Sequence, residues 1–216
     1  MTAPVCIRVG LCAAALAGWP LLASAQSSTP PAAQAAPAAQ PAPMRCPALL
    51  DHRQPRLQDE VQQDLCKYAG QVLLVVNTAS FCGYTDQYGG LERLHARFRA
   101  QGFSVLGFPS NDFSQEPGTN ADIAQFCEGT FGVKFPMFAK SNVRGGNANP
   151  VFAALAQASG QAPRWNFHKY LVGRDGRLIG AYPAQVAPDD PRLLADIQKT
   201  LAARIPQQSS PGQPTR

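Results

Sequence analysis

The chain has 216 residues, and its 19 Lys and Arg against 14 Asp and Glu give a net charge of +5 at pH 7. No run of basic residues and no alternation of basic with aromatic residues accompanies this excess, so the composition does not support nucleic-acid binding. The six cysteines and three histidines form no Cys-x-x-Cys pair and no pair at zinc-finger spacing, and neither a metal site nor another cofactor is expected.

The first 25 residues read as a secretory signal peptide. Arg8 is the only charged side chain there, an apolar stretch covers residues 9–22, and residues 23–25 are Ala-Ser-Ala, the A-x-A cleavage pattern. The apolar stretch is shorter than the roughly 20 residues of a membrane span. We expect cleavage after residue 25, no membrane span in the mature chain, and a periplasmic product, with full secretion as the alternative.

Two further segments lack the large apolar side chains that a core needs. Residues 26–45 are mostly Gln, Ser, Thr, Pro and Ala, and residues 206–216 are similarly polar and rich in Pro. Such compositions predict a disordered tether and a disordered tail. The remaining residues, 46–205, suit one domain.

The first predicted elements form a strand-helix-strand unit. Residues 72–76 are a continuous apolar run rich in Val, which is typical of a strand buried on both faces. Apolar residues 91, 94 and 98 recur at helical spacing before Gly102, and residues 103–108 read as a second strand. Two strands joined by one helix predict a parallel, right-handed unit.

The second half of the chain predicts two helices, a strand pair and a last helix. In chain order these are a helix capped at Thr119, a helix over 150–158, strands over 166–172 and 178–182, and a helix from Pro191. Asp122 completes a capping-box pattern with Thr119, and Asp175-Gly176 is a strong hairpin-turn signal. The order β-α-β, α, β-β-α predicts an α/β protein with a thioredoxin fold, in which helices flank a central mixed sheet.

Cys82 follows the first predicted strand, where a helical pattern is about to begin. Backbone N–H groups at a helix start carry partial positive charge, which favours a thiolate, the nucleophilic form of cysteine. A site at the carboxyl ends of the strands is also typical of open α/β sheets. The alternative is that Cys82 is an inert apolar residue under a loop.

Four separated segments of the chain resemble motifs of the glutathione peroxidase family, in the family's order. They are Asn-Thr-Ala-Ser-Phe-Cys-Gly-Tyr-Thr at 77–85, Gly-Phe-Pro-Ser-Asn-Asp-Phe-Ser-Gln-Glu-Pro-Gly at 107–118, Phe-Pro-Met-Phe-Ala-Lys at 135–140 and Arg-Trp-Asn-Phe-His-Lys-Tyr at 164–170. The resemblance implies a glutathione peroxidase-like domain. Cys82 matches the peroxidatic residue, and Gln115, Trp165 and Asn166 match the other members of the catalytic tetrad.

These residue types suit a thiol peroxidase. Amide and indole N–H groups are neutral donors that hydrogen-bond a thiolate and a peroxide oxygen without titrating. The resemblance implies that Cys82 reduces hydrogen peroxide or organic hydroperoxides and becomes a sulfenic acid. Cys127 resembles the resolving cysteine of two-cysteine members, which are usually reduced by thioredoxin-like proteins; glutathione is the other candidate reductant. Cys127 shares an apolar helix face, so reaching Cys82 requires local unwinding.

Four cysteines remain after residue 25, and three complete pairings exist. Cys46 and Cys66 lie outside the positions that the resemblance makes catalytic, and in an oxidising compartment we expect them to form a structural disulfide. The competing pair is Cys66 with Cys127.

The chain also departs from the common family pattern. The loop before Gln115 is one residue shorter, Asp112 replaces a frequent Gln, and Ser110 replaces a frequent Cys. The insertion that tetrameric animal members carry before the Trp-Asn motif is missing, so a monomer with an open site is expected. His168 is expected to be a supporting surface residue on the strand face of Asn166.

Two other functions are weighed against peroxidase activity. Thiol-disulfide exchange on client proteins is disfavoured because no second cysteine lies near Cys82, and a copper-delivery module lacks the same cysteine. A peroxide sensor remains, and it would consume peroxide stoichiometrically without turnover.

Overall fold

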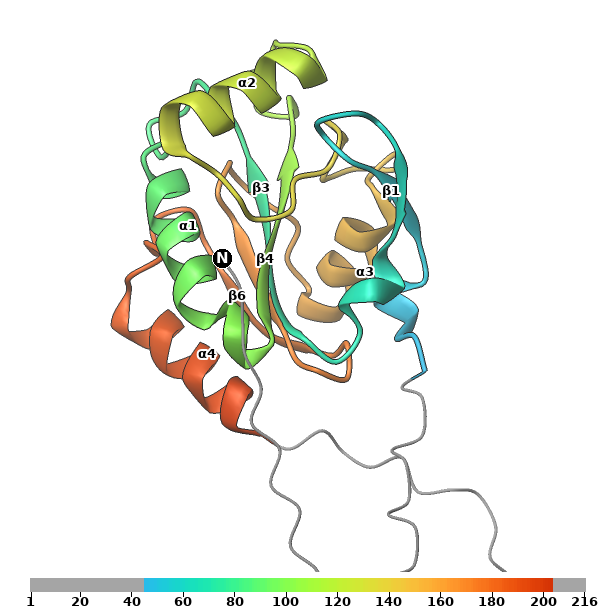
Figure 1. The fold of residues 1–216 in the computed structure, drawn as a ribbon. Coiled ribbons are helices and arrows are strands. Elements are labelled where there is room, and N and C mark those ends of the chain that lie inside the picture. Colours follow the sequence, from blue (N-terminus) through green and yellow to red (C-terminus); the bar gives the residue numbers. More distant parts are fainter. Residues whose placement is uncertain (1–44, 204–216) are drawn as a thin grey trace, which may run out of the picture. The chain divides into compact units, whose positions relative to one another are not determined.

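A four-stranded mixed sheet of order β4-β3-β5-β6 forms the centre of the computed structural model, which describes residues 45–203 (Figure 1). β3 (Val72–Thr78) is parallel to β4 (Phe103–Pro109) and antiparallel to β5 (Lys169–Val172), which pairs antiparallel with β6 (Leu178–Tyr182). The predicted α/β class, parallel unit and antiparallel pair are confirmed.

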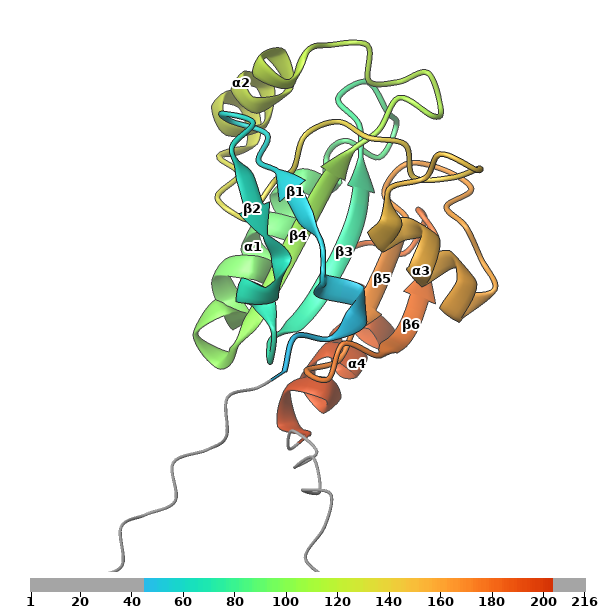
Figure 2. The ribbon, with the colours of Figure 1, turned by 90° about the vertical axis from the view of Figure 1, so that its right-hand side faces the viewer.

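Helices cover both faces of this sheet. α1 (Gln87–Phe98) and α4 (Pro191–Ala202) lie on one face, α3 (Pro150–Ser159) lies on the other, and α2 (Asn120–Phe131) lies beyond the carboxyl ends of β3 and β4 (Figures 1 and 2). Alternate side chains of β3 enter two separate apolar clusters, one with α1, α2 and α4 and one with α3. The strand is therefore buried on both faces, as its continuous apolar run predicts.

Local signals explain the ends of several helices. Thr119 accepts the backbone N–H of Asp122, and the Asp122 carboxylate accepts that of Thr119, so α2 begins with the predicted capping box. Asp190 caps α4. α1 begins at Gln87, before Gly89 and Gly90, and passes into a 3-10 turn, η3 (Arg99–Gln101), that ends at Gly102 with φ of 79°.

Residues 166–168 are not part of a strand, contrary to the prediction. Phe167 has a φ of 62°, which turns the chain before β5 begins at Lys169. A positive φ is incompatible with a β-strand, and nothing in the aromatic-rich sequence of this segment signals it.

The sequence also did not predict a short N-terminal hairpin. β1 (Arg53–Pro55) pairs antiparallel with β2 (Gln62–Asp64), and the 3-10 turns η1 (Ala48–Leu50) and η2 (Leu65–Tyr68) flank the pair. The hairpin joins the core through residues 136–139, because Leu57 N–H donates to Met137 O and Ala139 N–H donates to Pro55 O.

Several expectations concern residues outside the described range. These are the signal peptide, the tether up to residue 44 and the tail over 206–216. Within residues 45–203, no helix is both long enough and apolar enough to cross a membrane.

Candidate active site

Cys82 lies in a succession of turns between β3 and α1. Its N–H donates to the Thr85 hydroxyl at 3.0 Å, and its sulfur accepts the Tyr84 N–H at 3.4 Å. The residue is half-buried. The sequence suggested that Cys82 lies at the start of a helix, but the regular helix begins only at Gln87. The N–H of Tyr84, within the turn, is the donor that can stabilise charge on the sulfur.

Gln115 and Asn166 come from distant segments and meet in one hydrogen bond. Asn166 Nδ2 donates to Gln115 Oε1 at 2.9 Å, and Asn166 is fully buried. The Gln115 carbonyl accepts the N–H of Phe81 at 3.1 Å. The loop that carries Gln115 is thus joined both to the turn before β5 and to the turn that carries Cys82.

Trp165 lies at the surface beside this pair. It is 41% exposed, and its ring packs on Phe113 with centroids 5.4 Å apart. The Arg144 guanidinium lies 4.4 Å from the centre of the Phe113 ring. The indole is therefore held by a neighbouring aromatic ring while part of it stays open to solvent.

Asn77, near the end of β3, holds the Trp165–His168 segment, a role that the sequence analysis did not predict. Its Nδ2 donates to the Trp165 carbonyl at 3.1 Å, and its Oδ1 accepts the His168 N–H at 3.1 Å. Its own carbonyl accepts the Phe167 N–H. An amide at the end of an otherwise apolar strand is the one signal that pointed to this residue.

Glu116 is a second residue without a predicted role. It is 1% exposed, and its Oε2 accepts the Ser80 N–H at 2.8 Å and the Ser80 hydroxyl at 3.1 Å. Burial raises the pKa of this carboxyl, and the two bonds from Ser80 oppose that shift. Glu116 therefore contacts the turn that carries Cys82 only two residues before the thiol.

Cys127 lies on the buried face of α2 and is 2% exposed. Burial raises the pKa of its thiol to about 11. Cys82 and Cys127 are both free thiols, and both contact the apolar cluster that α1, α2 and α4 share. Cys127 is therefore a protonated, enclosed thiol in this conformation.

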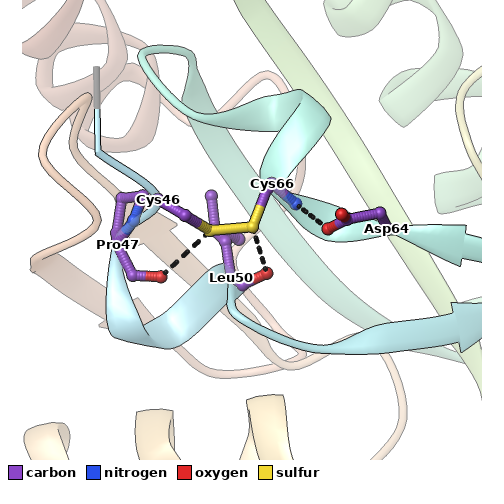
Figure 3. The surroundings of a disulfide bond; sticks show 5 residues. All are labelled: Cys46, Pro47, Leu50, Asp64 and Cys66. Atoms are coloured by element: carbon purple, nitrogen blue, oxygen red, sulfur yellow. Dashed lines mark hydrogen bonds between the residues drawn. A yellow bond between two sulfur atoms is a disulfide. The ribbon is translucent and has the colours of Figure 1, made fainter. Parts of the chain in front are cut away.

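Cys46 and Cys66 form the predicted disulfide, with an S–S distance of 2.07 Å (Figure 3). Asp64 accepts the Cys66 N–H at 2.8 Å. The Cys46 sulfur lies 3.6 Å from the Pro47 carbonyl oxygen, and the Cys66 sulfur lies 3.6 Å from that of Leu50. Figure 3 marks both contacts with dashed lines, but a disulfide sulfur has no hydrogen to donate, so neither is a conventional hydrogen bond. The competing pair of Cys66 with Cys127 is wrong.

Two buried basic residues follow Asn166. Lys169 is fully buried, and burial lowers the pKa of its amine to about 7. His168 is 4% exposed and packs on Tyr170, and burial together with the charge of Lys169 lowers the pKa of its imidazole to about 4. The expectation that His168 is a surface residue is wrong, because the turn at Phe167 breaks the strand alternation on which it depended.

Known proteins resemble this chain across most of the described domain. A family model described as glutathione peroxidase matches residues 52–156, which include Cys82, Gln115 and Cys127. The hydroperoxy fatty acid reductase gpx1 of Synechocystis is 46% identical over 145 residues, which are 62% of this chain and 85% of that protein. The chain belongs to the glutathione peroxidase family.

Another curated protein and a crystal structure with related names also resemble this glutathione peroxidase. The thioredoxin/glutathione peroxidase BtuE of Escherichia coli is 40% identical over 161 residues, covering 63% of this chain and 88% of its own. The crystal structure of Trgpx in apo form matches with a TM-score of 0.59 and 32% identity, over 73% of this chain and 98% of that chain. A thiol:disulfide interchange protein from Chlorobium tepidum, at TM-score 0.56 and 12% identity, shares the thioredoxin fold alone.

Proposed function

We propose that this thiol peroxidase reduces hydroperoxides at Cys82. The Cys82 thiolate attacks one peroxide oxygen, the O–O bond breaks, and the other oxygen leaves as water or an alcohol after taking a proton. Cys82 is oxidised to a sulfenic acid and the peroxide is reduced. The observation that carries the proposal is the bond between Gln115 and Asn166 at 2.9 Å, on a loop that is itself bonded to Phe81, next to Cys82.

The regeneration step is proposed to use Cys127. Its thiol condenses with the sulfenic acid, a disulfide forms and water leaves; a thioredoxin-like dithiol then reduces that disulfide by exchange. Because Cys127 is buried in α2, this route needs the helix to open locally. The same burial favours one alternative, in which a small thiol such as glutathione attacks the sulfenic acid of the half-buried Cys82 directly.

We also propose export to the periplasm. The Ala-Ser-Ala at 23–25 and the disulfide between Cys46 and Cys66 support it, since structural disulfides persist in oxidising compartments. Cell fractionation with N-terminal sequencing of the product tests this: a periplasmic chain that begins after Ala25 supports export, and a full-length cytosolic chain refutes it.

The mature protein is proposed to be a monomer, because the chain lacks the insertion that tetrameric animal members of the family carry before the Trp-Asn motif. Light scattering coupled to gel filtration measures the mass directly. A mass equal to that of a single chain supports the proposal, and a larger assembly contradicts it.

Intact mass spectrometry with disulfide mapping tests the chemistry. The reduced full chain receives one equivalent of hydrogen peroxide, beside the matched variants Cys82→Ser and Cys127→Ser. We expect a new bridge between Cys82 and Cys127 in the wild type, a single added oxygen on Cys82 in Cys127→Ser, and no peroxide consumption in Cys82→Ser. A wild type that acquires oxygen on Cys82 while Cys127 stays reduced favours glutathione, and an unreactive Cys82 overturns the peroxidase proposal.

A further inference from the structure

The carboxylate of Glu116 is buried without a cationic partner among the described residues. The ammonium of Lys140 donates to the backbone carbonyls of Glu116 and Gly118 and not to the carboxylate. Burial raises the pKa of the Glu116 carboxyl, and the charge of Lys140 acts to lower it. Burying a charged carboxylate costs several kcal/mol unless hydrogen bonds compensate for lost water. The hydrogen bonds to the carboxylate here come from the N–H and hydroxyl of Ser80.

These bonds belong to a larger junction between two loops. Gln115 accepts the N–H of Phe81 through its backbone carbonyl, so two consecutive residues of one loop bind two consecutive residues of the other, directly before Cys82. The Asn111 side chain accepts the Glu116 N–H at 2.9 Å and fixes the position of Glu116 from the other side. These hydrogen bonds fix the position of the segment that carries Cys82 relative to the segment that carries Gln115.

We infer that Glu116 is a positioning residue for the peroxidatic reaction: its carboxylate binds Ser80 and holds the turn that carries Cys82 against the loop that carries Gln115. This inference rests on the proposed function. A residue that only ends a turn before Pro117 does not need a buried carboxylate. A reaction that requires Cys82 and Gln115 at a fixed separation does need a group that holds their two loops together. A displacement of about 1 Å between reacting groups lowers rates by about 100-fold.

The test is the second-order rate constant for oxidation of Cys82 by hydrogen peroxide, measured in the full-length chain by rapid quenching with an alkylating reagent and mass spectrometry. Four variants are compared with the wild type: Glu116→Ala, Glu116→Gln, Ser80→Ala and the double variant Ser80→Ala/Glu116→Ala. The matched control is Asp122→Asn, because Asp122 lines the same pocket of about 370 Å³ as Glu116 but bonds Thr119 instead of Ser80. Thermal midpoints are recorded for all of them.

We expect Glu116→Ala to be slower by about 10- to 100-fold. Glu116→Gln should stay within about threefold of the wild type, because its amide oxygen accepts both bonds from Ser80. The double variant should be no slower than Glu116→Ala, since both changes break one interaction, and Asp122→Asn should react like the wild type.

Three results overturn the inference: a folded Glu116→Ala that reacts at the wild-type rate, a Glu116→Gln as slow as Glu116→Ala, or an Asp122→Asn that loses as much. Should Glu116→Ala fail to fold, Ser80→Ala decides, because it removes only one of the two bonds; a slower rate supports the inference and an unchanged rate refutes it. An unreactive wild-type Cys82 would instead refute the proposed function, so the two failures are distinguishable.

Discussion

Asn77 shows how one buried amide organises residues distant in the sequence. Its side chain bonds the Trp165 carbonyl and the His168 N–H, and its backbone carbonyl accepts the N–H of Phe167, which has a positive φ. A non-glycine residue in that region costs energy, and the hydrogen bonds from Asn77 compensate for it. The position of Trp165 and Asn166 therefore depends on a residue of β3 that is distant from them in the sequence.

We predict that Asn77→Ala loses both stability and peroxidase activity. It leaves the Trp165 carbonyl and the His168 N–H without their partner, and each unsatisfied buried group costs about 1–3 kcal/mol. Urea unfolding should show a loss of about 2–6 kcal/mol, and peroxide turnover should fall at least about 10-fold. The control is Asn147→Ala, at an exposed position, which should change neither quantity; a similar loss there would contradict this account.

Lys169 makes a pH-dependent contribution to stability. Its amine donates to the Phe167 carbonyl at 2.7 Å, and burial lowers its pKa from 10.5 to about 7. Above pH 10.5 the amine is neutral in both the folded and the unfolded state. As pH falls toward 7 the unfolded chain takes up the proton first, so the folded state loses stability over this window and the loss is constant below it.

We predict that Lys169→Met removes this pH dependence. As pH falls from 10.5 to 7, the free energy of unfolding of the variant should rise relative to that of the wild type. The upper limit of this rise is about 5 kcal/mol, because one pKa unit corresponds to about 1.4 kcal/mol. Chemical unfolding at several pH values measures the difference, with the exposed Lys67→Met as control. A difference that stays constant with pH would show that the amine is charged in the folded protein.

At the scale of elements, α2 governs access to Cys127. The thiol is on the buried face of the helix, and the capping box of Thr119 and Asp122 stabilises the first turn. If Cys127 becomes reactive only when α2 opens, its exposure should follow the stability of the helix start.

We predict that Thr119→Ala exposes Cys127 more often without changing the fold. Loss of an N-cap costs about 1 kcal/mol, which corresponds to about a fivefold rise in the population of the open helix. Alkylation of Cys127 in the reduced chain, followed by peptide mapping, should therefore be about fivefold faster. Thr130→Ala, an exposed threonine near the other end of α2, is the control, and equal acceleration in both variants would argue against local opening from the helix start.

Elements with strong local signals could be predicted, and elements set by tertiary contacts could not. The apolar run of β3, the capping box of α2 and the Asp175-Gly176 turn each contain their own signal. The hairpin of β1 and β2 does not, because its strands are three residues long and largely polar. The turn at Phe167 is held by Asn77 from another strand, so neighbouring residues do not reveal it.

At the scale of the whole molecule, the disulfide joins the first described residues to the start of the core. Cys46 and Cys66 are separated by 20 residues, and between them lie η1 and the β1–β2 hairpin. Closing a loop of this length restricts the unfolded chain and stabilises the fold by about 3 kcal/mol.

We predict that the double variant Cys46→Ala/Cys66→Ala is less stable by about 3 kcal/mol but oxidises Cys82 at the wild-type rate. Chemical unfolding gives the first quantity and quenched oxidation by peroxide gives the second. Cys46→Ala alone is a useful comparison, because it breaks the same bridge and should lose about as much stability. A large fall in the rate of Cys82 oxidation would show that the hairpin supports the reacting loop.

Only part of the candidate site could be predicted from the sequence. Cys82, Gln115, Trp165 and Asn166 could be named because whole motifs resemble a family, and the structure joins Gln115 to Asn166 directly. Glu116 and Asn77 could not be given roles, because their partners, Ser80 and the Trp165–His168 segment, become neighbours only in the folded chain. Residues that position a site act through tertiary contacts, and the sequence around each residue does not reveal those contacts.

β3 keeps the Cys46–Cys66 disulfide apart from Cys82. Cys66 lies before β3 and Cys82 after it, and seven extended residues at about 3.3 Å each separate the ends of the strand by roughly 20 Å. A thiolate at Cys82 therefore cannot attack the Cys46–Cys66 bridge while the strand is intact, because exchange requires contact between sulfur atoms. Within residues 45–203, the Cys46–Cys66 bridge is thereby protected from exchange with Cys82, so in the proposed reaction an oxidised Cys82 is left with Cys127 or an external thiol as its partner.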